Sequence, residues 1–405
     1  MKKNFFPSLK IIYNHYLPSY QAKIPNFQPQ QLKILIEKEA EKARKKYFNL
    51  KDPKIVPLNL YIEKWVEKKV SKDFVKKVLT SGFEPPKFTF PIKIEKYEEL
   101  IKEFWSISPE ERLAFWRKNL VALEKLKKAF QEIVSYRKSS ATAPYIELFK
   151  QKYKIPPGAY EKFVRENRKV IQKCNQNFPK IETLPPWFYS WFGRPCFICQ
   201  IDNFPLKNFE ETINFVSARY PILKPFLNKI KISLGKEVVS KYEVENDTFQ
   251  IILNKDVNTR HQIVELIHEL SHLVDYLESF EKGINPFKKG MYILEKRAFA
   301  REMKLEKELS FGLFQSMLAE FLLIIRTVLF EMQVYGGSNQ NLDKLYAETF
   351  NLCFKEGKQT SNPAYILDRQ IFMEPFSLLP HALVLVNLLG NWSSSENDLF
   401  EMIFI

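Results

Sequence analysis

The pentapeptide His268-Glu269-Leu270-Ser271-His272 constrains the fold of this chain more than any other stretch of its sequence. Since four residues make just over one turn of an α-helix, both imidazoles would leave the same helix face and could hold one metal ion. Glu269 lies beside that face, where a carboxylate can take a proton from a metal-activated water. The flanking apolar residues recur at helical spacing: Ile263, Leu266, Ile267, Val274 and Leu277. The sequence therefore predicts a buried, metal-binding helix over residues 258–280.

The position of a third ligand separates the classes of such sites. Metzincin-type sites use the residue six positions after the second histidine, reached through a glycine that turns the chain. Here Glu278 has that position and no glycine precedes it after His272, so Glu278 and Asp275 are interpreted as surface groups or as neighbours of a ligand. Glutamate zincins take the ligand from a following helix roughly 20 to 25 residues later. Glu295 lies in that window, and we expect His268, His272 and Glu295 to hold one Zn²⁺ ion. The alternative for Glu295 is an ordinary surface glutamate.

The predicted ligand set implies a reaction. Zinc held by three side chains keeps a fourth position for water, and the ion lowers the pKa of that water. Glu269 would accept the proton, the resulting hydroxide would attack a peptide carbonyl, and Glu269 would pass the proton to the leaving amine. Glu302, two helical turns after Glu295, is expected to orient a ligand imidazole or to be a plain helix charge. We therefore expect a zinc-dependent metallopeptidase.

The segment from Glu295 to Glu302 resembles a helix of one known family. Its sequence, Glu-Lys-Arg-Ala-Phe-Ala-Arg-Glu, is similar to the Glu-x-x-(Ser/Ala)-x-x-x-Glu helix of the thimet oligopeptidase and oligoendopeptidase F family. That family also has HExxH at a similar spacing, although Ser271 stands where its members usually have glycine. The resemblance covers about residues 245–305. It implies a mostly helical zinc peptidase with a deep channel, acting on oligopeptides.

The sequence offers three candidate donors that could stabilise the oxyanion. In the family, a C-terminal segment supplies a histidine and tyrosines that stabilise the transition state. The corresponding residues 373–383 here keep His381 and have no tyrosine. The resemblance implies that His381 is a catalytic donor, whereas a lone histidine among apolar residues is otherwise a core residue. Tyr346 and Tyr365 are the nearest upstream tyrosines and remain alternative donors.

The rest of the chain predicts a mainly α fold, a helical zincin-type metallopeptidase with a small β-sheet beside the active-site helix. Residues 1–180 are expected to form a basic helical domain that could be a channel wall, and residues 181–405 a zincin-like catalytic region. Helices are expected over residues 31–48, 58–79, 108–137, 157–177 and 209–220. The catalytic region would contain a sheet at 229–254, the HExxH helix at 258–280, a ligand helix at 291–309 and C-terminal helices. The third strand, 248–253, is expected to hold an extended substrate by edge pairing.

Charge and hydropathy limit the partners. Residues 1–200 hold 40 Lys/Arg against 20 Asp/Glu, but the cations are mostly lysines spread among glutamates at helical spacing. We interpret them as solvated helix faces, so a peptide is the expected partner and nucleic acid is not. The apolar residues 313–330 include Glu320 and Arg326 and predict a core helix, so no membrane partner is expected. The N-terminus has no apolar stretch of signal-peptide length, which favours a cytoplasmic location.

The four cysteines do not form a disulfide scaffold in so long a chain. Cys196 and Cys199 form a lone CxxC, which is weak support for structural zinc or redox chemistry and fits buried thiols better. Two alternatives to an oligopeptidase stay open. One is a non-catalytic binding or regulatory protein on a peptidase scaffold, suggested by the absent tyrosines, and the other is a protease dedicated to one folded protein.

Overall fold

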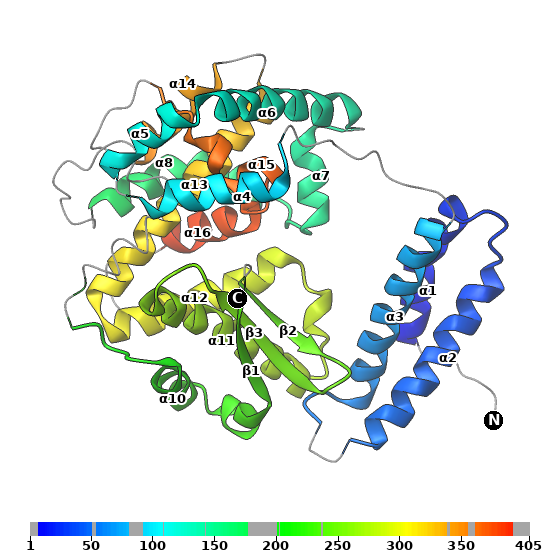
Figure 1. The fold of residues 1–405 in the computed structure, drawn as a ribbon. Helices are drawn as coiled ribbons and strands as arrows, with labels where there is room; N and C mark the ends of the chain where they lie inside the picture. Colours follow the sequence, from blue (N-terminus) through cyan, green and yellow to red (C-terminus); the bar gives the residue numbers. More distant parts are fainter. Residues whose placement is uncertain are drawn as a thin grey trace. The chain divides into compact units, whose positions relative to one another are not determined.

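The computed structural model describes residues 7–50, 54–80, 92–107, 109–141, 143–176, 201, 203–235, 238–337, 341–354 and 361–391. These residues are mainly helical and include one three-stranded sheet (Figure 1), which confirms the predicted mainly α class with a small sheet. The chain divides into two compact units. Unit 1 comprises Met1–Thr89, Tyr220–Leu253 and Tyr276–Pro286, and unit 2 comprises Phe90–Arg219, Asn254–Asp275 and Phe287–Ile405. The predicted boundary near residue 180 lies outside the described residues.

Unit 1 begins with three helices that contact one another, α1 (Pro7–Lys23), α2 (Pro29–Phe48) and α3 (Leu58–Thr80). Proline at the first position of α2 starts that helix with a favourable φ and no lost hydrogen bond. Its buried residues fall at a spacing of three to four, which places them on one face: Leu32, Ile36, Glu39, Ala40 and Ala43. The predicted helices 31–48 and 58–79 are confirmed, and α1 is an additional helix.

The sheet of unit 1 has the strand order β1-β3-β2, with β1 at Ile230–Gly235, β2 at Val239–Glu243 and β3 at Thr248–Asn254. It follows the 3-10 helix η1 (Pro221–Lys229). Strand β2 pairs antiparallel with β3, from Val239 opposite Ile252 to Glu243 opposite Thr248. The prediction that residues 248–253 hold a substrate by edge pairing is wrong, because β3 is the central strand and both of its edges are already paired.

Buried and half-buried residues alternate along β3, so one face of the sheet packs against the protein core. Phe249, Ile251 and Leu253 are buried, whereas the residues between them are half-buried. The Phe249 ring stacks on Tyr276 and Phe280, with ring centroids 6.2 and 6.4 Å apart, respectively. Both rings belong to the last turns of helix α11 (Thr259–Glu281), so the sheet packs beside that helix as the sequence predicts.

One large apolar core takes residues from most of the helices of unit 2. In chain order they are α4 (Ile94–Ser106), α5 (Pro109–Lys118), α6 (Leu120–Ser140), α7 (Tyr145–Lys152), α8 (Ala159–Gln176), α10 (Phe209–Arg219), most of α11, α12 (Met291–Leu309), α13 (Phe311–Gly336), α14 (Leu342–Cys353), α15 (Arg369–Met373) and α16 (Leu379–Asn391), with short 3-10 helices η2 (Pro286–Lys288) and η3 (Ala364–Leu367). Helix α13 could cross a membrane by length and composition alone. In this structure 89% of its most apolar window is buried inside the protein, where it forms part of the core.

One predicted helix of unit 2 is broken in two. The sequence predicts a single helix over residues 108–137, but α5 ends at Lys118 and α6 begins at Leu120. Asn119 leaves helical geometry, at φ −103° and ψ 11°, and its side-chain amide donates to the carbonyl of Phe115 at 3.0 Å. The backbone N–H of Asn119 donates to the same carbonyl at 3.0 Å, so both donors of Asn119 bond the last turn of α5. Ser108, the first residue of the predicted helix, lies outside the described residues.

The described cysteines are buried and free. Cys174 at the end of α8 and Cys353 at the end of α14 form no disulfide, and burial raises the pKa of each thiol to about 12. A thiol that stays protonated near neutral pH is a poor nucleophile and metal ligand. Cys196 and Cys199, together with the aromatic segment around residues 185–193, lie outside the described residues.

Candidate metal centre

Helix α11 carries the two histidines and is built to be buried. The helix starts after Asn258, whose side chain accepts a hydrogen bond from the backbone N–H of His261 at 2.9 Å. Its apolar residues at helical spacing are at most 2% exposed: Ile263, Leu266, Ile267, Leu270, Val274 and Leu277. The predicted HExxH helix is therefore confirmed, and its side chains are fixed on a rigid and well-packed element.

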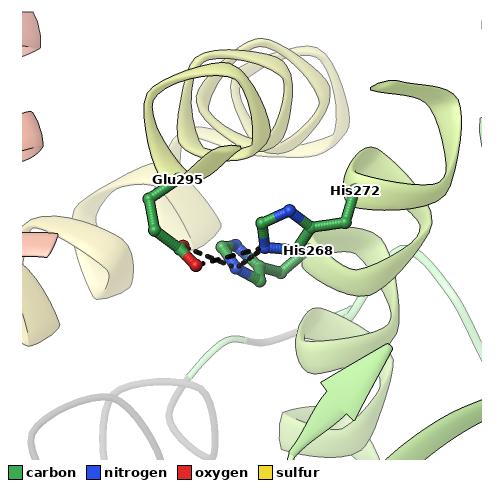
Figure 2. A group of neighbouring side chains, drawn as sticks. All are labelled: His268, His272 and Glu295. Carbon is green, nitrogen blue, oxygen red and sulfur yellow. Dashed lines mark hydrogen bonds and ion pairs between the residues drawn. The ribbon is translucent and has the colours of Figure 1, made fainter. Parts of the chain in front are cut away.

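Two imidazoles of α11 and one carboxylate of α12 converge (Figure 2). Nε2 of His268 lies 3.1 Å from Nε2 of His272, and it lies 3.4 Å from Oε2 of Glu295. Nε2 of His272 lies 3.5 Å from Oε1 of Glu295. Zinc bonds of about 2.0 to 2.2 Å put neighbouring tetrahedral ligands about 3.3 Å apart. These three residues, called the metal centre below, have the spacing of a ligand set and could hold a metal ion.

Burial makes this arrangement costly without a cation. Glu295 is 5% exposed, so the alternative reading of this residue as an ordinary surface glutamate is wrong. Its Oε2 atom has no hydrogen-bond partner among the described residues. A buried carboxylate that is incompletely bonded costs free energy, and a cation bound to it would reduce that cost. Among the described residues Glu295 faces only imidazoles, which fits the metal that the sequence predicts.

Glu302 contacts His268 on the side of the ring away from Glu295. Its Oε2 atom lies 2.7 Å from Nδ1 of His268, and the side chain is completely buried. Seven residues separate Glu302 from Glu295 on α12, which places both carboxylates on the same helix face. Nδ1 of His268 donates to this carboxylate, which fixes the tautomer in which Nε2 of the neutral imidazole faces the centre. The reading of Glu302 as a plain helix charge does not fit this position.

The charges of the centre reinforce one another. Burial alone would lower the pKa of His268, but the carboxylates of Glu302 and Glu295 outweigh it and hold that pKa well above its ordinary value. Burial would raise the pKa of Glu295, but His381, His272 and His268 hold it well below its ordinary value. The buried carboxylates thus favour positive charge at this point, whether from a proton or from a metal ion.

His381 also reaches the centre. It lies on α16, and its Nε2 atom is 3.4 Å from Oε2 of Glu295. Burial lowers its pKa below the ordinary value, which favours the neutral imidazole. The two tyrosine alternatives have other partners: the Tyr365 hydroxyl donates to Asp343, and the Arg326 guanidinium lies 4.6 Å from the centre of the Tyr346 ring.

Glu269 differs from the other acids of the site. It is 5% exposed, and no described residue forms a hydrogen bond or an ion pair with its carboxylate. Glu295 and Glu302 are both engaged by imidazoles, whereas Glu269 is not. A carboxylate that is buried without a cationic partner suits a group that takes and returns a proton.

Asp275 has a role that the sequence reading missed. It is completely buried and forms ion pairs with Lys289 at 3.3 Å and with Arg297. Arg297 lies on α12, two residues after Glu295, so this pair fixes the ligand helix against α11. Asp275 is therefore not a surface group, while Glu278 remains half-buried on α11. The sequence does contain a signal for this ion pair. Asp275 is an acidic residue on the predicted buried helix, and Arg297 is a basic residue two positions after Glu295.

Comparison of the chain with protein-family models, with curated proteins and with solved structures finds no match.

Proposed function

We propose that the protein is a zinc-dependent metallopeptidase. The observation that carries the proposal is the convergence of His268, His272 and Glu295, whose ligand atoms lie within 4.8 Å of one another. Two imidazoles and one carboxylate form a common catalytic zinc site, because three protein ligands leave a position open for water or substrate. The resemblance of residues 245–305 to the thimet oligopeptidase and oligoendopeptidase F family supports the same reaction and suggests oligopeptides as substrates.

The chain's own residues divide the chemistry among them. Zinc bound at the centre would polarise the peptide carbonyl and lower the pKa of a water molecule. Glu269 takes the proton of the attacking water and delivers it to the leaving amine, which a carboxylate without a cationic partner can do in both directions. Glu302 holds the Nδ1 proton of His268 and so fixes its tautomer. Burial of these groups strengthens each electrostatic interaction.

The decisive experiment separates metal binding from cleavage. Wild-type protein should bind about one zinc ion and digest a mixture of peptides of different lengths. Glu269→Gln should keep the zinc and lose at least about a hundredfold in cleavage rate, because the proton acceptor is gone. Glu278→Gln, on the same helix and half-buried, is the matched control and should stay active. Cleavage that survives Glu269→Gln with zinc still bound contradicts the proposal.

A second candidate function is a metal-binding protein without peptidase activity. The observation that favours it is the hydrogen bond from the Tyr365 hydroxyl to Asp343, which occupies one of the two tyrosines expected to stabilise an oxyanion. Wild-type protein that binds zinc and cleaves no peptide in the same mixture would support this candidate. A peptide-length series would also distinguish an oligopeptidase from a protease dedicated to one folded protein.

A further inference from the structure

The two oxygens of the Glu295 carboxylate face different histidines. Oε1 lies 3.5 Å from Nε2 of His272. Oε2 lies 3.4 Å from Nε2 of His268 and 3.4 Å from Nε2 of His381. Oε2 is also the oxygen that lacks a hydrogen-bond partner among the described residues. The two oxygens of the carboxylate therefore have different surroundings. The histidines near Oε2 are the groups best placed to donate a hydrogen bond to it.

A bound metal would leave only one of the three imidazoles free to donate a hydrogen bond to Glu295. His268 carries its proton at Nδ1, where Glu302 accepts it, so Nε2 of His268 offers a lone pair to the metal. Nε2 of His272 is directed at the same point and would also be a ligand. Neither ligand nitrogen could then donate a hydrogen bond to Glu295. His381 is not required as a metal ligand, so its Nε2 can carry a proton and donate a hydrogen bond to Glu295.

The neighbours of His381 favour this orientation. The ring of Phe299, which lies between Glu295 and Glu302 on α12, is 4.8 Å from the His268 ring and 5.7 Å from the His381 ring, measured between centroids. Phe299 is itself buried against Phe321 of α13. An aromatic side chain in contact with both imidazoles restricts their rotation. His381 is thus held with Nε2 toward the ligand carboxylate.

We propose that His381 is a positioning residue that donates from Nε2 to Oε2 of Glu295, so that the carboxylate ligates the metal through Oε1 alone. The inference rests on the proposed metal centre and deepens it. One coordinating oxygen leaves room at the ion for both water and a substrate carbonyl, whereas two would fill that room. His381 then acts through the ligand, and not by direct contact with the substrate as the family resemblance implies.

Metal affinity and the visible spectrum of the Co²⁺-loaded protein test the proposal without an activity assay. His381→Leu removes the donor and should weaken Zn²⁺ affinity about 10- to 100-fold, measured by competition with a chelator. It should also weaken the visible absorption of bound Co²⁺, because a second carboxylate oxygen raises the coordination number. His381→Gln retains an N–H donor near the position of Nε2 and should restore most of both properties.

Controls keep each outcome decisive. His261→Leu removes another α11 histidine, one that pairs with Glu265, and should change neither property. If His381→Leu does not fold without metal, His381→Asn replaces it, since its shorter amide falls short of Oε2. Wild-type affinity and spectrum in His381→Leu overturn the proposal. Equal losses in the Leu and Gln variants also overturn it, because His381 would then be a ligand itself.

Failure of this proposal can be distinguished from failure of the proposed function. Wild-type protein that binds Zn²⁺ but cleaves no peptide ends the peptidase proposal, while the affinity series still reports on His381. Wild-type protein that binds no Zn²⁺ and no Co²⁺ ends both. Peptidase activity together with an unaltered His381→Leu centre ends only the positioning role.

Discussion

Two buried carboxylates, one in each unit, are satisfied in opposite ways. Asp247 of unit 1 is 1% exposed and accepts from Lys229 Nζ at 2.7 Å, from the Tyr242 hydroxyl at 2.8 Å and from the Ile55 N–H at 3.1 Å. Its charge is neutralised and both of its oxygens are bonded. Glu295 of unit 2 is similarly buried but faces only imidazoles, and one of its oxygens accepts no hydrogen bond from the described residues.

The difference separates a structural carboxylate from one arranged for a ligand. The protein supplies Asp247 with a permanent cation, so nothing further is needed to complete its surroundings. Around Glu295 the protein supplies groups that can either hold a proton or give it up to a metal. Asp275 is also a buried carboxylate of unit 2, and it lies on the same helix as His268 and His272. Lys289 and Arg297 neutralise it, so unit 2 does pair a buried carboxylate with lysine and arginine. Among the described residues Glu295 has no lysine or arginine partner, and three histidines face it instead.

The largest effect that tests this comparison is expected at Glu295. Glu295→Gln removes the charged ligand and should weaken Zn²⁺ affinity at least about a thousandfold, or about 4 kcal/mol. The metal-free variant should remain folded, because the uncharged amide has the same size as the carboxylate it replaces. Chelator competition and thermal melting measure the two quantities. Zn²⁺ affinity that survives the substitution would show that Glu295 is not a ligand.

Asp247→Ala should have the next largest effect, and on stability alone. The substitution leaves Lys229 buried without its partner, and it removes the acceptor for Ile55 and Tyr242. Breaking a buried ion pair on one side costs about 3 to 5 kcal/mol, to be measured by urea unfolding of metal-free protein. The Zn²⁺ affinity of the folded fraction should not change.

A neighbour in the same turn is the matched control for Asp247. Glu245 pairs with Lys68 and Lys69 at 2.6 and 3.1 Å, but it is partly exposed to solvent. Glu245→Gln should therefore cost at most about 1 kcal/mol. Equal losses at the two positions would contradict the distinction between a buried carboxylate and an ordinary surface pair.

Local patterns made much of the metal centre predictable. The spacing of His268, Glu269 and His272 defines one helix face, and the interval to Glu295 leaves room for one turn of chain and a second helix. Helical periodicity is a property of neighbouring residues, so α11 and α12 follow from their own segments. The burial of Glu295 was not predictable in the same way, because it depends on what packs around α12.

Non-local contacts explain what the sequence did not reveal. Asp247 reads as a turn residue, yet one partner, Ile55, lies 192 positions away in sequence. The central place of β3 depends on strand order, which the separate strand patterns do not encode. The break at Asn119 is a departure from helical geometry at one residue, which helical periodicity cannot anticipate. Helix α1 contains Pro18, which masks its helical pattern.

The effects of pH are expected to be smallest, and their sign differs between the metal-free and metal-bound states. In metal-free protein the raised pKa of His268 adds stability that is complete below the unfolded pKa and is lost as pH rises through the folded pKa. The lowered pKa of Glu295 adds stability that is present above its unfolded pKa and is lost as pH falls through the folded pKa. Metal binding needs the neutral imidazole, so Zn²⁺ affinity rises as His268 loses its proton.

Thermal melting over a pH series with and without Zn²⁺ therefore tests whether the proton and the metal ion compete for the imidazole of His268. The metal-free melting temperature should fall as pH rises through the folded pKa of His268, while the increase caused by Zn²⁺ should grow. Glu302→Gln removes a carboxylate that raises this pKa, so the metal-free decline should move to lower pH. A Zn²⁺-induced increase that does not depend on pH would mean that metal and proton do not compete for His268. The centre would then resemble Asp247, with its charge already satisfied by the protein.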